Sequence, residues 1–359
     1  MIFRSFFLAG FESAAGHQTV PESGARQVDA TYRRLREVGI RAAREAVHWP
    51  VIDRKGHYDF SSVVPFLDAA YDQRIDVIWD LFHDGYPPDL DPFQPAFIHR
   101  FASYCAAAAR FIQARTTGTC WFTPINQPSY FAWAGGETGR VAPHRLGEGH
   151  DLTIVLARAA IAGINAIRSV CPGARMVNVD PLCHVVPPSG SFDRYEECES
   201  FNHGAVFESW DLLSGRLMPE LGGSREHLDV IGINCSAANQ WEIGRPEQPL
   251  AADDGRRVPL RRLVRRVWER YGGEVMITQT NRAGELQPTG VAEVEHECEA
   301  ILAEGIPLRG VCLHSPLGTP LWDAAQATGS RCQALCQPML DALRKAQRIE
   351  RRFQMGAHT

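Results

Sequence analysis

The fold is decided by residues 121–129, Trp121-Phe-Thr-Pro-Ile-Asn-Gln-Pro-Ser129, a run of β-favouring residues that passes into an Asn-Gln-Pro turn. Residues 274–280, Glu274-Val-Met-Ile-Thr-Gln-Thr280, form a second short apolar run that ends in polar residues. Each run predicts a buried strand with a glutamine, Gln127 or Gln279, at its carboxyl end. Barrel proteins keep their functional residues at that end of the strands, so the two glutamines are the first candidates for a site.

Comparable apolar runs alternate with amphipathic stretches along the chain. Strands are predicted at residues 6–10, 40–46, 76–81, 120–125, 175–179, 228–234, 274–278 and 308–313. Helices are predicted at residues 25–38, 63–72, 95–114, 152–170, 196–217, 260–271, 291–304 and 332–348. Eight strands alternating with eight helices predict an α/β fold, a (β/α)₈ barrel, because each parallel strand needs a crossover helix and closure removes both sheet edges.

An open, doubly wound sheet is the alternative fold. Against it, the segment from Gly10 to Gly16 lacks the G-x-G-x-x-G spacing of a dinucleotide-binding turn. The length of 359 residues and the hydrophobic content of 45% fit one barrel-sized domain spanning residues 1–359. Residues 243–258 are rich in proline and glycine and predict a long loop over the active-site face.

Charge and apolar patterning limit the classes of partner. The formal net charge of −5 offers no broad basic surface, so we expect no nucleic-acid partner. Lysines and arginines gather only at 256–266 and 344–352, as expected of solvated helix faces. No run approaches the ~20 apolar residues of a membrane span, and residues 6–9 are too short for a signal-peptide core. We therefore expect no membrane partner.

The ten cysteines lack the framework of a small disulfide-stapled domain. Several lie inside apolar patterns, which predicts reduced core residues in a cytoplasmic protein: Cys105, Cys171, Cys298 and Cys312. Cys332 and Cys336 could share one helix face, but no second Cys or His pair at zinc-ligand spacing accompanies them. Neither a metal nor an organic cofactor is implied.

The predicted loops after the strands combine aromatic rings with amides, imidazoles and carboxylates. The relevant segments are 79–88, 129–136, 180–188 and 238–242. A polyhydroxylated ligand suits such a rim, because its C–H faces stack on aromatic rings and its hydroxyls need directed hydrogen bonds. A small sugar-like molecule is therefore the expected partner.

Over nearly its whole length, the chain resembles the family-one type of clan A glycoside hydrolases. Within that family it resembles in particular a bacterial branch. The resemblance rests on motifs that follow successive predicted strands in order. These are Gly10-Phe-Glu12, Arg44 with Trp49, His83, Asn126-Gln-Pro128, Asn234 with Asn239-Gln-Trp241, and Ile277-Thr-Gln279.

The resemblance implies retaining hydrolysis, with a glutamate as acid/base at position 127 and a glutamate as nucleophile at position 279. This chain has glutamine at both. Retaining hydrolysis needs one carboxylic acid to protonate the leaving oxygen and one carboxylate to attack the anomeric carbon. An amide does neither, because it does not exchange a proton near neutral pH and is a poor nucleophile.

Two explanations of the glutamines stay open: natural divergence, or isosteric inactivation of an ordinary glycosidase. Neighbouring segments favour divergence. Cys235-Ser236 and His314-Ser-Pro-Leu-Gly318 stand where the resemblance implies aromatic or acid-rich sugar-binding segments.

The candidate site residues combine the strand-end positions with groups that titrate or form directed hydrogen bonds. Arg44 and Asp80 are equally suited to a structural ion pair and to a substrate contact. Catalytic candidates are Gln127, Gln279, His83, Asp180 and His184. Substrate-binding candidates are Glu12, Arg44, Asp84, Asn126, Trp133, His144, Asn234, Asn239, Trp241, His314 and Trp322.

Three functions remain. The first is a repurposed enzyme that performs a non-hydrolytic reaction on a sugar or another polar, ring-shaped metabolite, as in specialised metabolism. The second is a carbohydrate-binding pseudoenzyme without turnover. The third is a retaining β-glycosidase inactivated by Glu to Gln substitution at both catalytic positions.

Overall fold

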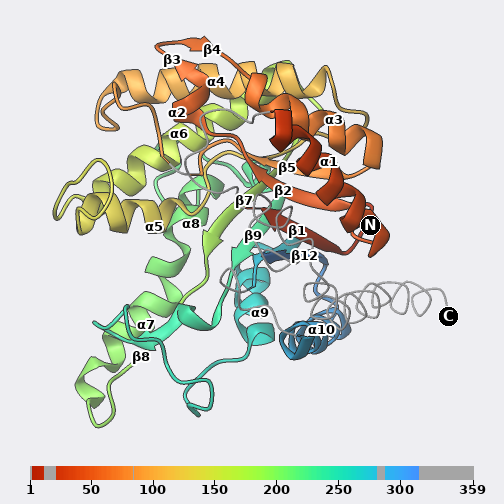
Figure 1. The fold of residues 1–359 in the computed structure, drawn as a ribbon. Coiled ribbons are helices and arrows are strands. Elements are labelled where there is room, and N and C mark those ends of the chain that lie inside the picture. Colours follow the sequence, from red (N-terminus) through yellow and green to blue (C-terminus); the bar gives the residue numbers. More distant parts are fainter. Residues whose placement is uncertain (1, 12–21, 84, 281–287, 315–359) are drawn as a thin grey trace.

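The computed structural model describes residues 2–11, 22–83, 85–280 and 288–314. Eight parallel strands close into a barrel at the centre of the molecule, and the last strand pairs with the first (Figure 1). The predicted (β/α)₈ barrel is confirmed, and all eight strands lie where the apolar runs predict them. In barrel order they are β1 (Phe7–Phe11), β2 (Ala42–Ala46), β5 (Asp76–Asp80), β6 (Trp121–Thr123), β7 (Arg175–Pro181), β9 (Val230–Asn234), β11 (Glu274–Gln279) and β12 (Leu308–His314).

Helices surround the barrel and follow the predicted positions, with one exception. The stretch predicted as one helix at 196–217 is two, because α7 ends at His203 and the backbone of Gly204 (φ −124°, ψ −81°) is not helical. The predicted helix at 332–348 lies outside the described residues. The longer helices are α1 (Glu22–Glu37), α3 (Val64–Gln73), α4 (Pro95–Gln113), α6 (Gly149–Val170), α7 (Tyr195–His203), α9 (Leu260–Tyr271) and α10 (Pro288–Ala303); the shorter ones are α2 (Trp49–Ile52), α5 (Pro128–Ala132) and α8 (Glu208–Ser214).

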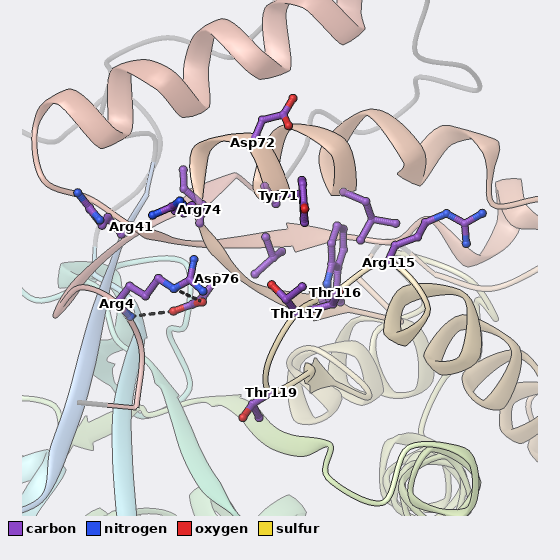
Figure 2. Close-up of a pocket in the computed structure, with 15 residues that line it drawn as sticks. Arg4, Arg41, Tyr71, Asp72, Arg74, Asp76, Arg115, Thr116, Thr117 and Thr119 are labelled. Carbon is purple, nitrogen blue, oxygen red and sulfur yellow. Dashed lines mark hydrogen bonds and ion pairs between the residues drawn. The ribbon is translucent and has the colours of Figure 1, made fainter.

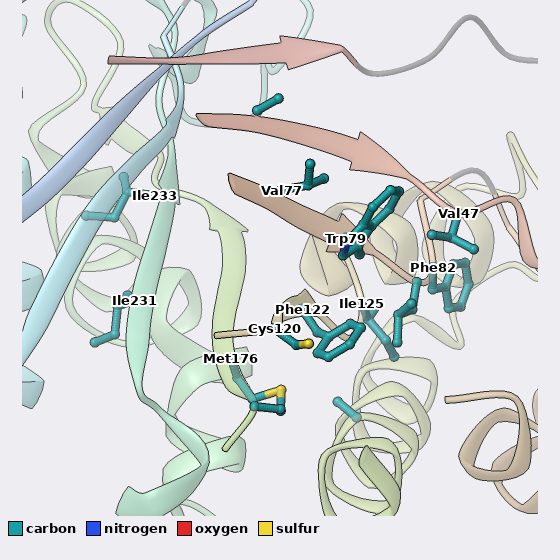
Figure 3. Close-up of a cluster of buried hydrophobic side chains, with 14 of the residues drawn as sticks. Val47, Val77, Trp79, Phe82, Cys120, Phe122, Ile125, Met176, Ile231 and Ile233 are labelled. Carbon is teal, nitrogen blue, oxygen red and sulfur yellow. The ribbon is translucent and has the colours of Figure 1, made fainter. Parts of the chain in front are cut away.

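Two apolar layers hold the barrel together, because alternate side chains of a strand point to opposite faces. The inner layer fills the barrel with residues such as Leu8, Ile78 and Met276. The outer layer lies between strands and helices and includes Trp79 and Phe122 (Figure 3). The alternation of side chains along each strand therefore determines which of them face the barrel interior and which face the helices.

Glycine is required at position 232 inside the barrel. A Cβ added to Gly232 would lie 2.7 Å from a methyl group of Val179 and 3.0 Å from that of Thr278. Real Cβ atoms do not approach so closely, so β7, β9 and β11 meet at a point that admits no side chain. This close approach lies just below the end of β11 that carries Gln279.

A small two-stranded sheet, formed by β8 (His184–Val186) and β10 (Gln240–Glu242), stands beside the barrel near α7 (Figure 1). Residues 243–258 follow β10 without a helix or strand. The side chain of Gln240 joins the two ends of this loop: it donates to the Val258 carbonyl and accepts from the Val258 N–H, both at 2.8 Å. Arg256 adds an ion pair to Glu242 at 2.9 Å, so the loop is tied to its own ends. A further hairpin, formed by β3 (Asp53–Arg54) and β4 (His57–Tyr58), belongs neither to the barrel nor to the sheet of β8 and β10.

The eight cysteines in the described ranges carry free thiols, and Cys105, Cys171, Cys298 and Cys312 are buried as predicted. Helix α6 is, by length and composition, apolar enough to cross a bilayer, which the sequence analysis overlooked. Half of its apolar window is buried, and the helix packs against α4, α5 and α8. Packing in the core accounts for this composition.

Candidate functional site

Gln127 follows β6 in a left-handed backbone conformation (φ 51°, ψ 55°), which few residues other than glycine adopt. Its N–H donates to the Val179 carbonyl at 3.0 Å, and its own carbonyl accepts from the Phe131 N–H at 3.0 Å. Pro128 then begins α5, where a fixed φ favours the first helical turn. Backbone bonds on both sides therefore fix the direction of the Gln127 side chain.

Gln279 is the last residue of β11, and its carbonyl accepts from the Cys235 N–H at 2.9 Å. The side-chain Nε2 of Gln127 donates to Oε1 of Gln279 at 3.2 Å. Both residues are half-buried. The structure therefore brings the two glutamines together, amide against amide, at the carboxyl ends of the strands.

Arg44 lies under this pair and is only 3% exposed. Its guanidinium donates to Asp80 Oδ1 at 3.0 Å, to Asn126 Oδ1 at 2.6 Å and to the Thr278 carbonyl at 3.3 Å. Asn126 precedes Gln127 and Thr278 precedes Gln279, so one cation joins both glutamine-bearing segments. Such a planar group with several fixed donors is suited to this bridging.

Asp80 is 1% exposed and accepts both from Arg44 and from the His83 ring, whose Nδ1 lies 2.9 Å from Oδ2. Burial alone would raise the pKa of Asp80, but Arg44 and His83 overcome this, so the pKa lies below its ordinary value. Of the two roles left open for Arg44 and Asp80, the structure shows the buried ion pair, at 2.7 Å.

Asn126 is oriented by Arg44, which occupies its oxygen, so its Nδ2 faces the Nδ1 of His83 at 3.1 Å. An ionised Asp80 favours the tautomer of His83 with the proton on Nδ1. His83 is 10% exposed and in this tautomer is held by Asp80, since an Nδ1 that carries the proton does not also accept from the Asn126 amide. Arg44, Asn126 and His83, all predicted site residues, thus form one hydrogen-bonded group with Asp80.

Asn234 stands at the end of β9 beside Gln279 in the strand register. Its Oδ1 accepts from the Thr278 hydroxyl at 2.6 Å, while its buried Nδ2 has no hydrogen-bond partner among the residues that the structure describes. Asn239 supports the loop after this strand, donating to the Asn234 carbonyl at 3.2 Å and accepting from the Ser236 hydroxyl at 2.7 Å. Asn239 is therefore occupied in holding its own loop.

Asp180 lies elsewhere than predicted. Strand β7 runs to Pro181, so Asp180 lies within the strand and alternates to the face opposite Val179, toward α5 and α8. There its Oδ1 accepts from the N–H and the hydroxyl of Ser129, at 3.1 and 2.9 Å. Burial raises the pKa of Asp180 to about 7, against the lowering effect of the Ser209 and Ser129 hydroxyls. It anchors the helix after Gln127 and is not directed at the glutamine pair.

His184 is also separated from the pair, because it begins β8 of the small outer sheet. Its Nδ1 lies 3.4 Å from the Arg266 guanidinium of α9. Burial, and then the charge of Arg266, lower the pKa of His184 to about 4, so it is neutral near pH 7. Trp241 lies in the partner strand β10 and packs edge-on against Phe201, with ring centroids 6.2 Å apart.

Trp133 and His144 belong to the segment that follows α5. The Trp133 ring is half-buried, and the Arg140 guanidinium stands 4.7 Å from its centroid. His144 is exposed, with its Nδ1 3.0 Å from the Gly139 carbonyl. Glu12, Asp84 and Trp322 lie outside the described residues, and His314 is placed only as the last residue of β12, in register with Gly10.

The sequence analysis missed Glu45, a carboxylate inside β2 that is 1% exposed. Its Oε1 accepts from the Tyr32 hydroxyl at 2.6 Å, while the buried Oε2 has no hydrogen bond to any described residue. Burial raises the pKa of Glu45 to about 8. Two adjacent charged residues, Arg44 and Glu45, inside an otherwise apolar strand were the available signal, because neighbours on a strand face opposite sides.

Within the described ranges, no three His, Cys, Asp or Glu side chains come together as a metal site. No protein-family model matches the chain, and no curated protein sequence does.

Solved structures do match, over most of their length. The virulence factor SghA in complex with its substrate analogue salicin shares 18% identity with a TM-score of 0.67, covering 87% of each chain. The family 1 β-glucosidase from Thermotoga maritima shares 15% with a TM-score of 0.65, covering 81% of this chain and 76% of its own. The Thermotoga maritima β-glucosidase in complex with noeuromycin shares 16% with a TM-score of 0.66, covering 87% of each. At these identities the likeness shows a glycoside-hydrolase-like barrel fold.

Proposed function

We propose that this protein binds a sugar or sugar-like ring at the carboxyl ends of its barrel strands and does not hydrolyse glycosides by the retaining mechanism. The observation that carries the proposal is the direct contact between Gln127 and Gln279, 3.2 Å from amide nitrogen to amide oxygen. Retaining enzymes hold two carboxyl groups about 5 Å apart at such a site. Two neutral amides supply neither the proton nor the nucleophile.

The remaining polar groups support binding of a neutral, hydroxyl-rich ligand. Each glutamine amide offers both donors and an acceptor, and a ligand hydroxyl can replace the amide-to-amide contact without leaving a partner unpaired. Beside Gln279, the buried Nδ2 of Asn234 is a donor without a partner in the described part of the chain. SghA with its substrate analogue salicin and the Thermotoga maritima β-glucosidase with noeuromycin are barrels of the same fold with a ligand bound.

Catalysis of a non-hydrolytic reaction is the second candidate, and the contact between His83 and Asp80 favours it. An imidazole whose Nδ1 donates to an ionised, buried carboxylate 2.9 Å away is oriented for proton transfer at its other nitrogen. With Asp180 and His184 placed elsewhere, His83 is the titratable group of the described site that suits this role. The reaction would be a proton transfer on the bound ring.

Hydrolysis of a panel of nitrophenyl β-glycosides tests the main proposal, using this chain and its Gln127→Glu, Gln279→Glu double variant. We expect no hydrolysis by this chain. Turnover by this chain overturns the proposal. Turnover by the double variant alone identifies a glycosidase site disabled by two amides.

Calorimetric titration with free monosaccharides and aryl glycosides tests binding. We expect saturable binding by this chain and a loss of roughly tenfold or more in the Gln127→Ala, Gln279→Ala variant, since each lost hydrogen bond to a ligand costs about 0.5–1.5 kcal/mol. Unchanged binding places the ligand elsewhere. Catalysis is followed by mass spectrometry of ligand incubated in D₂O, because a proton transfer on the ring leaves the mass unchanged in ordinary water: deuterium taken up by the ligand with this chain but not with His83→Asn supports the second candidate.

A further inference from the structure

A hollow lies at the end of the barrel opposite the glutamine pair, where the chain enters β2, β5 and β6 (Figure 2). Its volume is about 630 Å³, within the range of small-molecule sites. The glutamine pair stands at the carboxyl ends of the strands, so the two sites are separated by the length of the barrel. Binding in this hollow is therefore independent of the function proposed above.

Four arginines line this hollow against two aspartates, in a chain whose formal net charge is −5. Asp76 is already satisfied, since it accepts from the Arg4 N–H at 2.8 Å and forms an ion pair with the Arg4 guanidinium at 3.3 Å. Arg115 lies over the Phe111 ring at 3.9 Å and donates to that residue's carbonyl. Two of the four arginines are thus engaged.

Arg41 and Arg74 have no carboxylate partner within the described ranges, and both are exposed. Arg41 precedes β2 and Arg74 follows α3, and Figure 2 draws both at the same end of the hollow as the Arg4 and Asp76 pair. Unpaired guanidinium groups beside a cavity form a local positive field that attracts an anion, and their planar donor arrangement matches phosphate oxygens.

The remainder of the lining suits the organic part of a ligand. Tyr71 is 65% exposed and offers its aromatic ring at the edge of the hollow. The threonines 116, 117 and 119 add hydroxyl groups, and Leu67 and Ile75 add apolar surface. A single inorganic phosphate would leave most of 630 Å³ unfilled.

We propose that this hollow binds an organic phosphomonoester, with its phosphate at Arg41 and Arg74 and its ring toward Tyr71. A dianionic phosphate offers three acceptor oxygens to the two guanidinium groups. The ring gains contact area on the aromatic and apolar part of the lining. The phosphate is thus the group of the ligand that is recognised by the positive charge at this end of the barrel.

Isothermal titration calorimetry of the full chain with AMP, adenosine and inorganic phosphate tests the proposal. We expect AMP to bind at least about tenfold more tightly than either fragment, because only AMP uses both parts of the lining. Inorganic phosphate binding as tightly as AMP, adenosine binding as tightly as AMP, or no binding of AMP each overturns the proposal.

The Arg41→Gln, Arg74→Gln variant is expected to weaken AMP binding by roughly tenfold or more, since charge-assisted hydrogen bonds are lost. A matched control, Arg158→Gln with Arg262→Gln, removes the same charge from two exposed arginines that do not line the hollow. If the control weakens AMP binding equally, the effect is one of net charge and the site is refuted. Thermal unfolding of both variants checks that they are folded.

Discussion

The Gln127 side chain donates to the Gln279 side chain although the two residues are 152 positions apart in the sequence. Arg44 holds the two segments that carry these glutamines, because it donates to the Asn126 side chain, next to Gln127, and to the Thr278 carbonyl, next to Gln279. Two glutamates in the same places would repel each other when ionised, so one would be protonated near neutral pH. Two amides form a hydrogen bond at any pH, and the contact is therefore insensitive to acid and base.

Arg44→Met is expected to lower the free energy of unfolding by about 3–5 kcal/mol, because it leaves the buried Asp80 without its cation. Urea unfolding measures this. The exposed pair of Arg33 and Asp29 is a control, and Arg33→Met is expected to cost less than about 1 kcal/mol. Adding Asp80→Asn to Arg44→Met should recover part of the loss. Equal losses in the two single variants would show that Arg44 contributes as a surface charge does.

Asp180→Asn tests the raised pKa of a buried carboxyl group. The folded-state pKa of about 7 exceeds the ordinary 3.8, so the stability contributed by the protonated form is present below pH 3.8 and is lost as the pH rises through 7. This chain should therefore lose stability relative to Asp180→Asn between pH 4 and 7, by an amount on the order of 4 kcal/mol. Urea unfolding at several pH values measures the difference. A difference that stays flat with pH contradicts the prediction.

Tyr32→Phe removes the hydroxyl that donates to Glu45. We expect a loss of about 1–3 kcal/mol, larger at pH 9 than at pH 7, because Glu45, with a pKa of about 8, is ionised at the higher pH. Tyr104→Phe is a matched control, since that buried hydroxyl donates to the neutral Val47 carbonyl at 3.3 Å. Chemical unfolding at both pH values should show a pH-dependent loss for Tyr32→Phe only. The same loss at pH 7 and 9 would show that Glu45 stays protonated.

The left-handed backbone of Gln127 predicts that Gln127→Gly is more stable than Gln127→Ala by about 1 kcal/mol, because glycine adopts this conformation without a steric cost. Both variants lose the amide contact to Gln279, so the comparison isolates the backbone. Thermal unfolding of the pair measures it. An alanine variant at least as stable as the glycine variant would mean that the backbone is not strained at this position.

The sequence predicted the barrel well because buried parallel strands are short apolar runs and their crossover helices are amphipathic. It also predicted Arg44, Asn126 and His83 beside the glutamines, since Asn126 and His83 follow strands and Arg44 lies in the last half of β2. Asp180 was misplaced for a physical reason. Strand β7 continues two residues beyond the predicted end at Val179, so Asp180 alternates to the outer face. Consecutive side chains of a strand point to opposite faces, so the direction of a residue near the strand end depends on whether the strand includes it. Apolar patterning does not locate strand ends to one residue.

His184 and Trp241 could not be placed from the sequence, because the small sheet of β8 and β10 pairs segments from two separate loops. Such a pairing leaves no periodic signal in either segment. Glu45 was missed because its partner Tyr32 lies in the preceding helix α1, and only the packing of that helix on β2 brings the two together.

The pairing of β1 with β12 also bears on how the chain is made. Residues 308–314 leave the ribosome after nearly all of the barrel has emerged, and until then β1 and β11 are open edges that can pair with other chains. During synthesis, the two edges of the unfinished sheet are thus exposed until the last strand, β12, pairs with both of them. Truncation before residue 308 should therefore yield an aggregation-prone polypeptide instead of a smaller barrel.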